Sequence, residues 1–171
     1  MFEGQVSMVS KSGSGDVCVV YVFGNQTLLD DVKGLWEALN QHHLKNSTHF
    51  KQYYEAMTFE KRKQAILKKA TAGEMHVAVA VDSKTNQKVG YCVSSLDGEK
   101  TGEIESIFVA SAYRGKGVGD TLMKDALAWM DGKSAGKKTV AVGAGNEQAF
   151  GFYERYGFVP RKTVLEQARS K

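Results

Sequence analysis

The chain has 171 residues, which suits one domain with a sizeable core and is too short for two full domains. Its hydrophobic fraction of 42% and charged fraction of 25% exclude a fibrous or largely disordered chain. The formal net charge of +4 favours polyanionic ligands without requiring nucleic acid.

Residues 1–15 are expected to form a flexible N-terminal segment, followed by a single domain over residues 16–171. The opening has neither the basic region nor the apolar region of a secretory signal. No run approaches the roughly 18 apolar residues that span a bilayer. The sequence therefore predicts a cytoplasmic protein with no membrane partner. Cys18 and Cys92 lie in apolar runs and are expected to be buried, reduced thiols.

The first half of the domain predicts a strand and two helices. Residues 16–23 are β-branched and apolar, and are typical of a strand. Thr27 is the expected N-cap of a helix with apolar residues at helical spacing. Thr58 is the expected N-cap of a second helix that ends at Gly73. Residues 41–57 show no clean period, so the boundaries there stay open.

The second half predicts three strands joined by short links, an antiparallel meander, at residues 75–81, 88–94 and 103–109. A helix, a strand, a helix and a strand follow at residues 117–131, 138–142, 147–156 and 158–165. The order β-α-α-β-β-β-α-β-α-β predicts one mixed α/β sheet without a linker or repeat.

The link from the third meander strand to the next helix carries the sequence RGKGVG, at residues 114–119. Helix N-termini bind phosphate through unpaired N–H groups and a partial positive charge, and glycines let the backbone approach closely. The sequence is not a Walker loop, and it lacks the third glycine of a dinucleotide fingerprint. A glycine-rich helix entry without a ligand stays open as the alternative.

A second feature lies in NEQAFGFYERYGF. Asn146 stands at the expected N-cap of the helix, and Tyr153 follows seven residues later, nearly two turns, on the same side. With the strand–loop–helix segment SIFVASAYRGKGVGDTLM and the order of the elements, this region resembles the GNAT superfamily of N-acetyltransferases. The resemblance is specific in the second half of the chain and only topological in the first.

The resemblance implies a GNAT-like acyl-CoA N-acyltransferase fold, in which acetyl-CoA lies where the strand before the loop splays away from the next strand. It implies that Tyr153 is the general acid for the departing thiolate and that a main-chain N–H, that of Val109, stabilises the oxyanion. The residues implied to bind the cofactor are Ile107, Phe108, Val109, Arg114, Gly115, Lys116, Gly117, Val118, Gly119, Asn146 and Tyr153.

Glu103 and Glu105, two residues apart on a strand, are expected on one face together with Ile107 and Val109. The family often has its general base there, so both glutamates are candidates, with a solvated strand edge as the alternative. Asp120 departs from the family pattern, in which a neutral or basic residue is usual directly after the last loop glycine. Because an acidic side chain repels phosphate, the Asp120 side chain is expected to point away.

The implied reaction is direct acetyl transfer from acetyl-CoA to a primary amine of a small molecule or peptide. A non-catalytic acyl-CoA sensor of the same fold is the alternative, and a homodimer stays open. His42, His43 and His49 lack the spacing of a metal site, so no metal is expected. Basic and aromatic residues do not interleave as nucleic-acid binding on strands would require.

Overall fold

The computed structural model describes residues 6–7, 18–70 and 74–168. Its six-stranded sheet has the order β1-β2-β3-β4-β5-β6. Neighbouring strands are antiparallel from β1 to β5, and β6 runs parallel to β5. The strands are β1 (Val6–Ser7), β2 (Val19–Gly24), β3 (Glu74–Asp82), β4 (Lys88–Leu96), β5 (Thr101–Val109) and β6 (Lys137–Val140). The α-helices are α1 (Lys33–Asn46), α2 (Lys51–Ala56), α3 (Phe59–Ala70), α4 (Val118–Gly132) and α5 (Phe150–Glu154). Three short 3-10 helices are η1 (Gln26–Val32), η2 (Ser111–Tyr113) and η3 (Glu147–Ala149).

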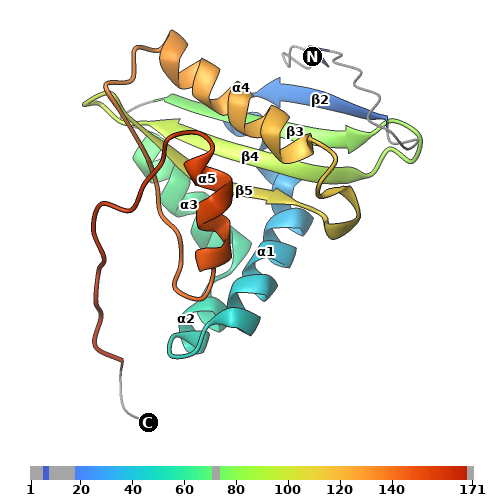
Figure 1. Ribbon diagram of the computed structural model, residues 1–171. Coiled ribbons are helices and arrows are strands. Elements are labelled where there is room, and N and C mark those ends of the chain that lie inside the picture. The colour runs from blue at the N-terminus through green and yellow to red at the C-terminus, as the bar shows by residue number, and fades with distance from the viewer. Residues whose placement is uncertain (1–5, 8–17, 71–73, 169–171) are drawn as a thin grey trace.

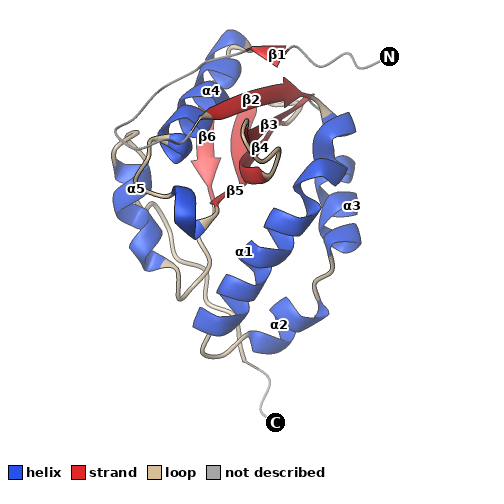
Figure 2. Ribbon diagram, turned by 90° about the vertical axis from the view of Figure 1, so that its right-hand side faces the viewer, coloured by secondary structure: helices blue, strands red, loops and turns tan. Residues whose placement is uncertain are grey.

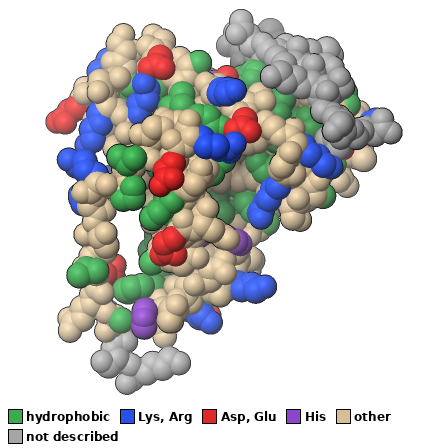
Figure 3. Space-filling model, viewed as in Figure 1, with side chains coloured by type: hydrophobic (Ala, Val, Ile, Leu, Met, Phe, Trp, Pro, Cys, Tyr) green, Lys and Arg blue, Asp and Glu red, His purple; other side chains and the backbone are tan. Residues whose placement is uncertain are grey.

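Helices cover both faces of the sheet. Helix α4 crosses the face toward the viewer in Figure 1, while α1 and α3 pack on the other face. Figure 2 shows α5 and α1 on either side of the end of β5. Basic and acidic side chains are intermixed over the face seen in Figure 3. Any attraction for phosphate on this face must therefore come from a local arrangement of residues.

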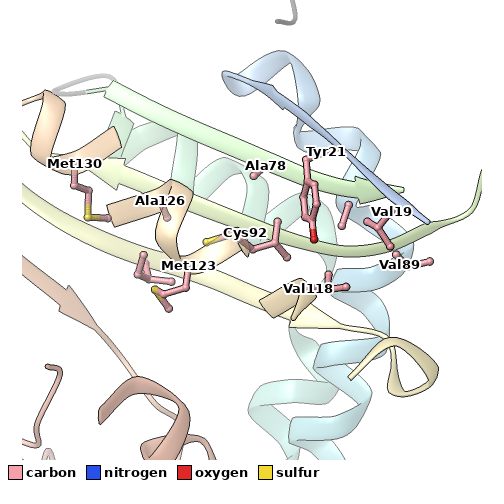
Figure 4. Packing of buried hydrophobic residues seen from close by; sticks show 12 residues of the cluster. Val19, Tyr21, Ala78, Val89, Cys92, Val118, Met123, Ala126 and Met130 are labelled. Carbon is pink, nitrogen blue, oxygen red and sulfur yellow. The ribbon is translucent and has the colours of Figure 1, made fainter. Parts of the chain in front are cut away.

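Each face of the sheet has its own buried cluster. On the α4 side, Figure 4 shows Met123, Ala126 and Met130 of α4 lying against strand residues that include Tyr21 and Cys92. These α4 residues recur at helical spacing, which is why one side of the helix is buried. The other cluster joins apolar residues of η1, α1 and α3 to the opposite face of β3 and β4. Helix α4 is thereby fixed on strands β3, β4 and β5, with its N-terminus near the end of β5.

The meander and the mixed sheet predicted from sequence are confirmed. The first predicted helix begins earlier than expected, because Asn25 and not Thr27 caps η1: its Oδ1 accepts from the Thr27 N–H at 3.0 Å. Thr58 does cap α3, accepting from the Lys61 N–H at 3.3 Å. Within the predicted flexible segment 1–15, Val6–Ser7 form strand β1; the rest of that segment, and residues 16–17 of the first predicted strand, lie outside the described residues.

The strand predicted at residues 158–165 is wrong. After α5 this segment is irregular, and it runs toward the end of the molecule where α2 lies (Figures 1 and 2). Val159, Val164 and Leu165 are 73%, 77% and 91% exposed. β-branched residues favour a strand only where a neighbouring strand supplies hydrogen bonds and packing, and here none does.

Candidate active site

Strand β5 contains a β-bulge. Val93 of β4 pairs with Ser106, but the next residue, Ser94, pairs with Ile104. Glu105 is therefore an extra residue on β5 with no partner across the ladder. The bulge shifts the alternation of side chains by one residue along the rest of the strand.

The faces of β5 follow from this shift. Ile107 and Val109 pack with the cluster on the α4 side of the sheet. Glu103 and Glu105 instead contact Lys69 of α3 on the opposite side. The prediction that these four strand residues share one face is wrong, because strict alternation ends at the bulge.

The second half of β5 has a free edge. Strand β6 pairs with β5 only along residues 101–104 and then diverges, so the predicted splay is present. On the other edge the Ala110 N–H donates to the Val89 carbonyl at 2.8 Å. Because main-chain groups alternate between the two edges of a strand, those of Ile107 and Val109 point away from β4 and into the splay. A ligand in the splay can therefore pair with this backbone as a further strand would.

The loop between β5 and α4 has a backbone that only its glycines readily adopt. Gly115 and Gly117 have φ values of 71° and 81°, in the left-handed region. A Cβ on either would meet no atom within 4 Å, so the loop is open. The N-cap of α4 is Gly117, which has no side chain to cap the helix. The N–H groups of the first turn also have no partner within the helix. The loop and helix end thus form an accessible site for an anion.

Two basic side chains lie on this loop. Arg114 lies over the ring of Phe108 at 5.4 Å, and its Nε donates to the Val109 carbonyl at 2.9 Å. Lys116 lies 5.6 Å from the centre of the Tyr113 ring. Gly119, at the end of the loop, is held against α5, since an added Cβ would lie 3.3 Å from the Phe152 ring.

Asp120 follows the loop, in the first turn of α4. Its Oδ1 accepts a short hydrogen bond from the Tyr156 hydroxyl and lies 3.1 Å from the guanidinium of Arg155. Burial, together with the bond to Asp120, raises the pKa of Tyr156 to about 12. The carboxylate is therefore bound to the end of α5.

Asn146 begins η3, before α5, as predicted, but its side chain makes no capping bond. Instead its Oδ1 lies 3.3 Å from Nε2 of His42 on α1. The Nδ2 of Asn46 also approaches that imidazole nitrogen, at 3.1 Å, and the Nε2 of Gln148 lies 3.4 Å from it. This amide network joins α1 to the segment that carries Asn146.

The close approach of α1 to this segment depends on Gly145, which has a φ of 90°. An added Cβ there would lie 2.4 Å from the Asn46 carbonyl oxygen, closer than any real contact.

Tyr153 of α5 packs edge-on against Phe152 and Phe158. Burial is the main reason that the pKa of Tyr153 is raised to about 12, with a further contribution from Cys92. Over the described chain, no hydrogen-bond partner is recorded for its hydroxyl. The phenol therefore stays protonated at neutral pH and is free to donate to a bound group.

A cavity of about 530 Å³ joins these parts. It brings together most of the residues predicted to bind the cofactor, along with the predicted acid, Tyr153. Lys116 and Val118 are not part of its lining. Val118, the first residue of α4, is instead buried in the core. The lining consists of Leu39, His42, Ile107, Phe108, Val109, Arg114, Gly115, Gly117, Gly119, Asp120, Asn146, Gln148, Ala149, Phe152, Tyr153 and Arg155.

Sequence reasoning missed several lining residues, above all His42 and Arg155. Arg155 had a sequence signal, because it follows Tyr153 by two residues in the same short helical segment. His42 had no such signal: it lies in a polar stretch without helical period, more than 100 residues from Asn146. Only the packing of α1 against the segment before α5 brings it to the cavity.

Glu103 and Glu105 lie outside the cavity lining, in a charged cluster between β5 and α3. The Glu105 side chain is 2% exposed and accepts from Arg62 at 3.0 Å and from Ser95 at 2.6 Å. Lys69 contacts both glutamates, at 2.5 Å for Glu103 and 2.8 Å for Glu105. Burial opposes the charge on Lys69, but these carboxylates raise its pKa on balance. Both oxygens of Glu105 are thus engaged by neighbouring side chains.

Cys92 is buried as predicted, and burial raises its pKa to about 12. The thiol is therefore protonated at neutral pH and unsuited to act as a nucleophile. Among residues 6–7, 18–70 and 74–168, no group of three or more His, Cys, Asp or Glu side chains has the arrangement of a metal site. In the same part of the chain, no helix combines the length and apolar character needed to cross a bilayer.

Comparison with solved structures defines the class of fold. The chain is similar to an acetyl transferase from Pyrococcus furiosus, with a TM-score of 0.62, 20% identity and coverage of 86% of this chain and 98% of the other. It is also similar to the aminoglycoside N-acetyltransferase AAC(6')-Iy in complex with CoA, with a TM-score of 0.64, 14% identity and coverage of 92% and 99%. The predicted GNAT-like fold is thereby confirmed.

The sequence comparisons give the family. The model described as the acetyltransferase (GNAT) family matches residues 36–158, and the chain belongs to this family. An uncharacterised N-acetyltransferase of Methanocaldococcus jannaschii is 34% identical over 74 residues, which are 42% of this chain. The match spans about a third (32%) of the length of that relative.

Proposed function

We propose that the protein transfers an acetyl group from acetyl-CoA to a primary amine of a small molecule or peptide. The observation that carries the proposal is the convergence of three features on one cavity. They are the free edge of β5, the open loop at the start of α4 and the hydroxyl of Tyr153, which has no hydrogen-bond partner among the described residues. The volume, about 530 Å³, is in the range of sites for ligands of this size.

The residues present fit the chemical groups of acetyl-CoA. The pyrophosphate suits the N–H groups at the start of α4, with Gly115 and Gly117 allowing close approach and Arg114 adding charge. The amides of the pantetheine arm suit the main-chain N–H and carbonyl of Ile107 in the splay, because both sides offer donors and acceptors. Val109 offers its N–H alone, since its carbonyl already accepts from Arg114. In this proposal Asn146 donates to the same arm.

The chemical step requires an oxyanion donor and an acid. The amine nitrogen attacks the thioester carbonyl carbon, and the electron pair of the carbonyl bond moves onto oxygen. In this proposal the Val109 N–H donates to that oxygen. As the carbonyl re-forms, the carbon–sulfur bond breaks, its electrons leave with sulfur, and Tyr153 donates its proton to the thiolate. The nitrogen became positively charged on attack, and it gives up a proton as the amide forms; passed through water, that proton restores the Tyr153 phenol. The products are the acetylated amine and CoA.

The amine must also lose a proton, because most amines are protonated at neutral pH. Glu103 and Glu105 remain the sequence candidates for this role, and they would act through water because neither lines the cavity. His42 is a second candidate, because it lines the cavity and histidine is the side chain that most often serves as a general base.

A non-catalytic acyl-CoA sensor of the same fold is the alternative. The hydroxyl of Tyr153 favours the enzyme, since a protonated phenol at the cavity can act as the acid that the departing thiolate requires, whereas a sensor requires no acid.

The test is release of free thiol from acetyl-CoA in the presence of a panel of amines, with the acetylated product identified by mass. The panel comprises phenethylamine, spermidine, an aminoglycoside and a lysine-containing peptide. Thiol release matched by acetylated amine is the expected result. Binding of acetyl-CoA with no thiol release for any amine would support the sensor.

A further inference from the structure

Asp120 stands where an acidic residue is unfavourable under the proposed function. It lies in the first turn of α4, directly after the loop proposed to bind the pyrophosphate, and it lines the cavity. A lone carboxylate there would repel phosphate, although it is favourable for the helix dipole. The carboxylate of Asp120 is not alone, however, because two side chains contact it.

Both partners of Asp120 lie directly after α5. The Tyr156 hydroxyl donates to Oδ1, and Arg155 places a guanidinium nitrogen 3.1 Å from the same oxygen. Arg155 is further held by two aromatic rings, with its guanidinium carbon 5.0 Å from the centre of Phe152 and 5.7 Å from that of Tyr156. An ion pair between exposed residues rarely orients a side chain alone, but this one acts together with two ring contacts.

Arg155 retains the capacity to bind an anion. Its side chain is 54% exposed and lines the same cavity as Arg114 and the loop glycines. A guanidinium has five N–H donors in a fixed plane, and in the described part of the chain Asp120 is the one acceptor recorded for it. The remaining donors suit phosphate oxygens, which guanidinium binds in a bidentate manner.

We propose that Arg155 binds a phosphate group of the CoA moiety and that Asp120 is the positioning residue that holds Arg155 in the cavity beside the loop of residues 114–119. The proposal rests on the proposed function for the identity of the ligand. The phosphate is either the pyrophosphate or the 3′-phosphate of CoA, which share the chemistry that Arg155 recognises.

The direction in which one substitution changes the affinity for CoA tests the role of Asp120. In Asp120→Asn, the amide keeps an oxygen for Tyr156 but loses the charge that holds Arg155. If Asp120 positions Arg155, calorimetry will show CoA binding weakened, by about tenfold for loss of a charge-assisted contact. If Asp120 only repels phosphate, the same variant will bind CoA more tightly, and the proposal is overturned. Asp120→Glu should restore part of the affinity.

The variant Arg155→Gln tests the contact itself. It should weaken CoA binding by at least the same factor, and adding Asp120→Asn to it should cause no further loss. Arg161→Gln is the matched control, because Arg161 is exposed, lies on the segment after α5 and is absent from the lining. It removes the same charge and should leave CoA affinity within twofold. Wild-type affinity in Arg155→Gln, with thermal unfolding unchanged, would refute the contact.

Binding of 3′-dephospho-CoA shows which of the two phosphate groups Arg155 contacts. If Arg155 binds the 3′-phosphate, Arg155→Gln will weaken the binding of CoA but not that of 3′-dephospho-CoA. If Arg155 binds the pyrophosphate, the variant will weaken the binding of both ligands equally, as expected for Arg114→Gln. In either case the KM for acetyl-CoA should rise while kcat at saturation stays unchanged, because neither residue reaches the thioester. Failure of the wild-type protein to bind any CoA ligand would instead reject the proposed function.

Discussion

Replacement of Tyr153 by Phe removes one oxygen from the cavity and little else. The ring contacts of Tyr153 with Phe152 and Phe158 are kept, and no hydrogen bond within the described chain is lost. The unfolding temperature should therefore change by less than about 2 °C, which corresponds to less than about 1 kcal/mol for a domain of this size. Acetyl-CoA binding should also stay within twofold of the wild type.

The rate should fall sharply. A positioned proton donor contributes roughly 10²–10⁴-fold to a rate. We expect kcat for Tyr153→Phe to drop at least about a hundredfold, or roughly 2.7 kcal/mol of transition-state stabilisation. Thiol release at saturating acetyl-CoA measures kcat, and calorimetry measures binding in the same samples. A wild-type rate would refute the role of Tyr153 and assign protonation of the thiolate to water. A fall in binding to match the rate would show that the hydroxyl holds the substrate and is not an acid.

The same residue gives a prediction for alkaline pH. The pKa of Tyr153 is raised to about 12, whereas an unfolded tyrosine has a pKa of about 10. The folded state therefore favours the protonated phenol, and this stabilisation is complete below pH 10 and lost as the pH rises toward 12. Between these values the unfolding temperature of the wild type should fall faster than that of Tyr153→Phe. Parallel curves from calorimetric scans would contradict the buried setting of the phenol.

Two further variants test the packing around the site. Glu105→Gln should leave Arg62 without its counter-charge and Lys69 with Glu103 alone. The expected cost is about 2 kcal/mol, less than for a fully buried pair because both cations are partly exposed. An unfolding temperature lower by roughly 4–8 °C is expected, and no change would show the cluster to be unimportant. Gly145→Ala should place a Cβ against the Asn46 carbonyl, on a backbone in the left-handed region, and cost at least about 2 kcal/mol of stability. Acetyl-CoA binding should weaken as well. Normal stability in chemical denaturation would rule out the close approach of Gly145 to Asn46.

Much of the fold could be predicted from local sequence pattern. Apolar β-branched runs gave the meander strands, and the helical spacing of Met123 and Ala126 gave the buried side of α4. The segment predicted as a strand at residues 158–165 also contains β-branched residues, yet no strand among the described residues pairs with it, and so its backbone stays irregular. Composition reports the preference of a segment, whereas pairing depends on the rest of the chain.

The site was predicted only where its residues are close in sequence. The loop of residues 114–119 and the Asn146–Tyr153 spacing each lie within one short segment. The bulge at Glu105 has no comparable signal, because one unpaired residue reverses the faces of a strand without altering its composition. The presence of His42 at the cavity depends on tertiary packing of α1, which no local pattern encodes.

Under the proposed function, an acyl-CoA occupies the cavity between the free edge of β5 and the N-terminus of α4. Calorimetric titration with acetyl-CoA, ATP and NAD tests this occupancy. We predict saturable one-to-one binding of acetyl-CoA that weakens in Arg114→Gln, with much weaker binding of ATP and NAD. Tight binding of either nucleotide with no response to acetyl-CoA would contradict the account.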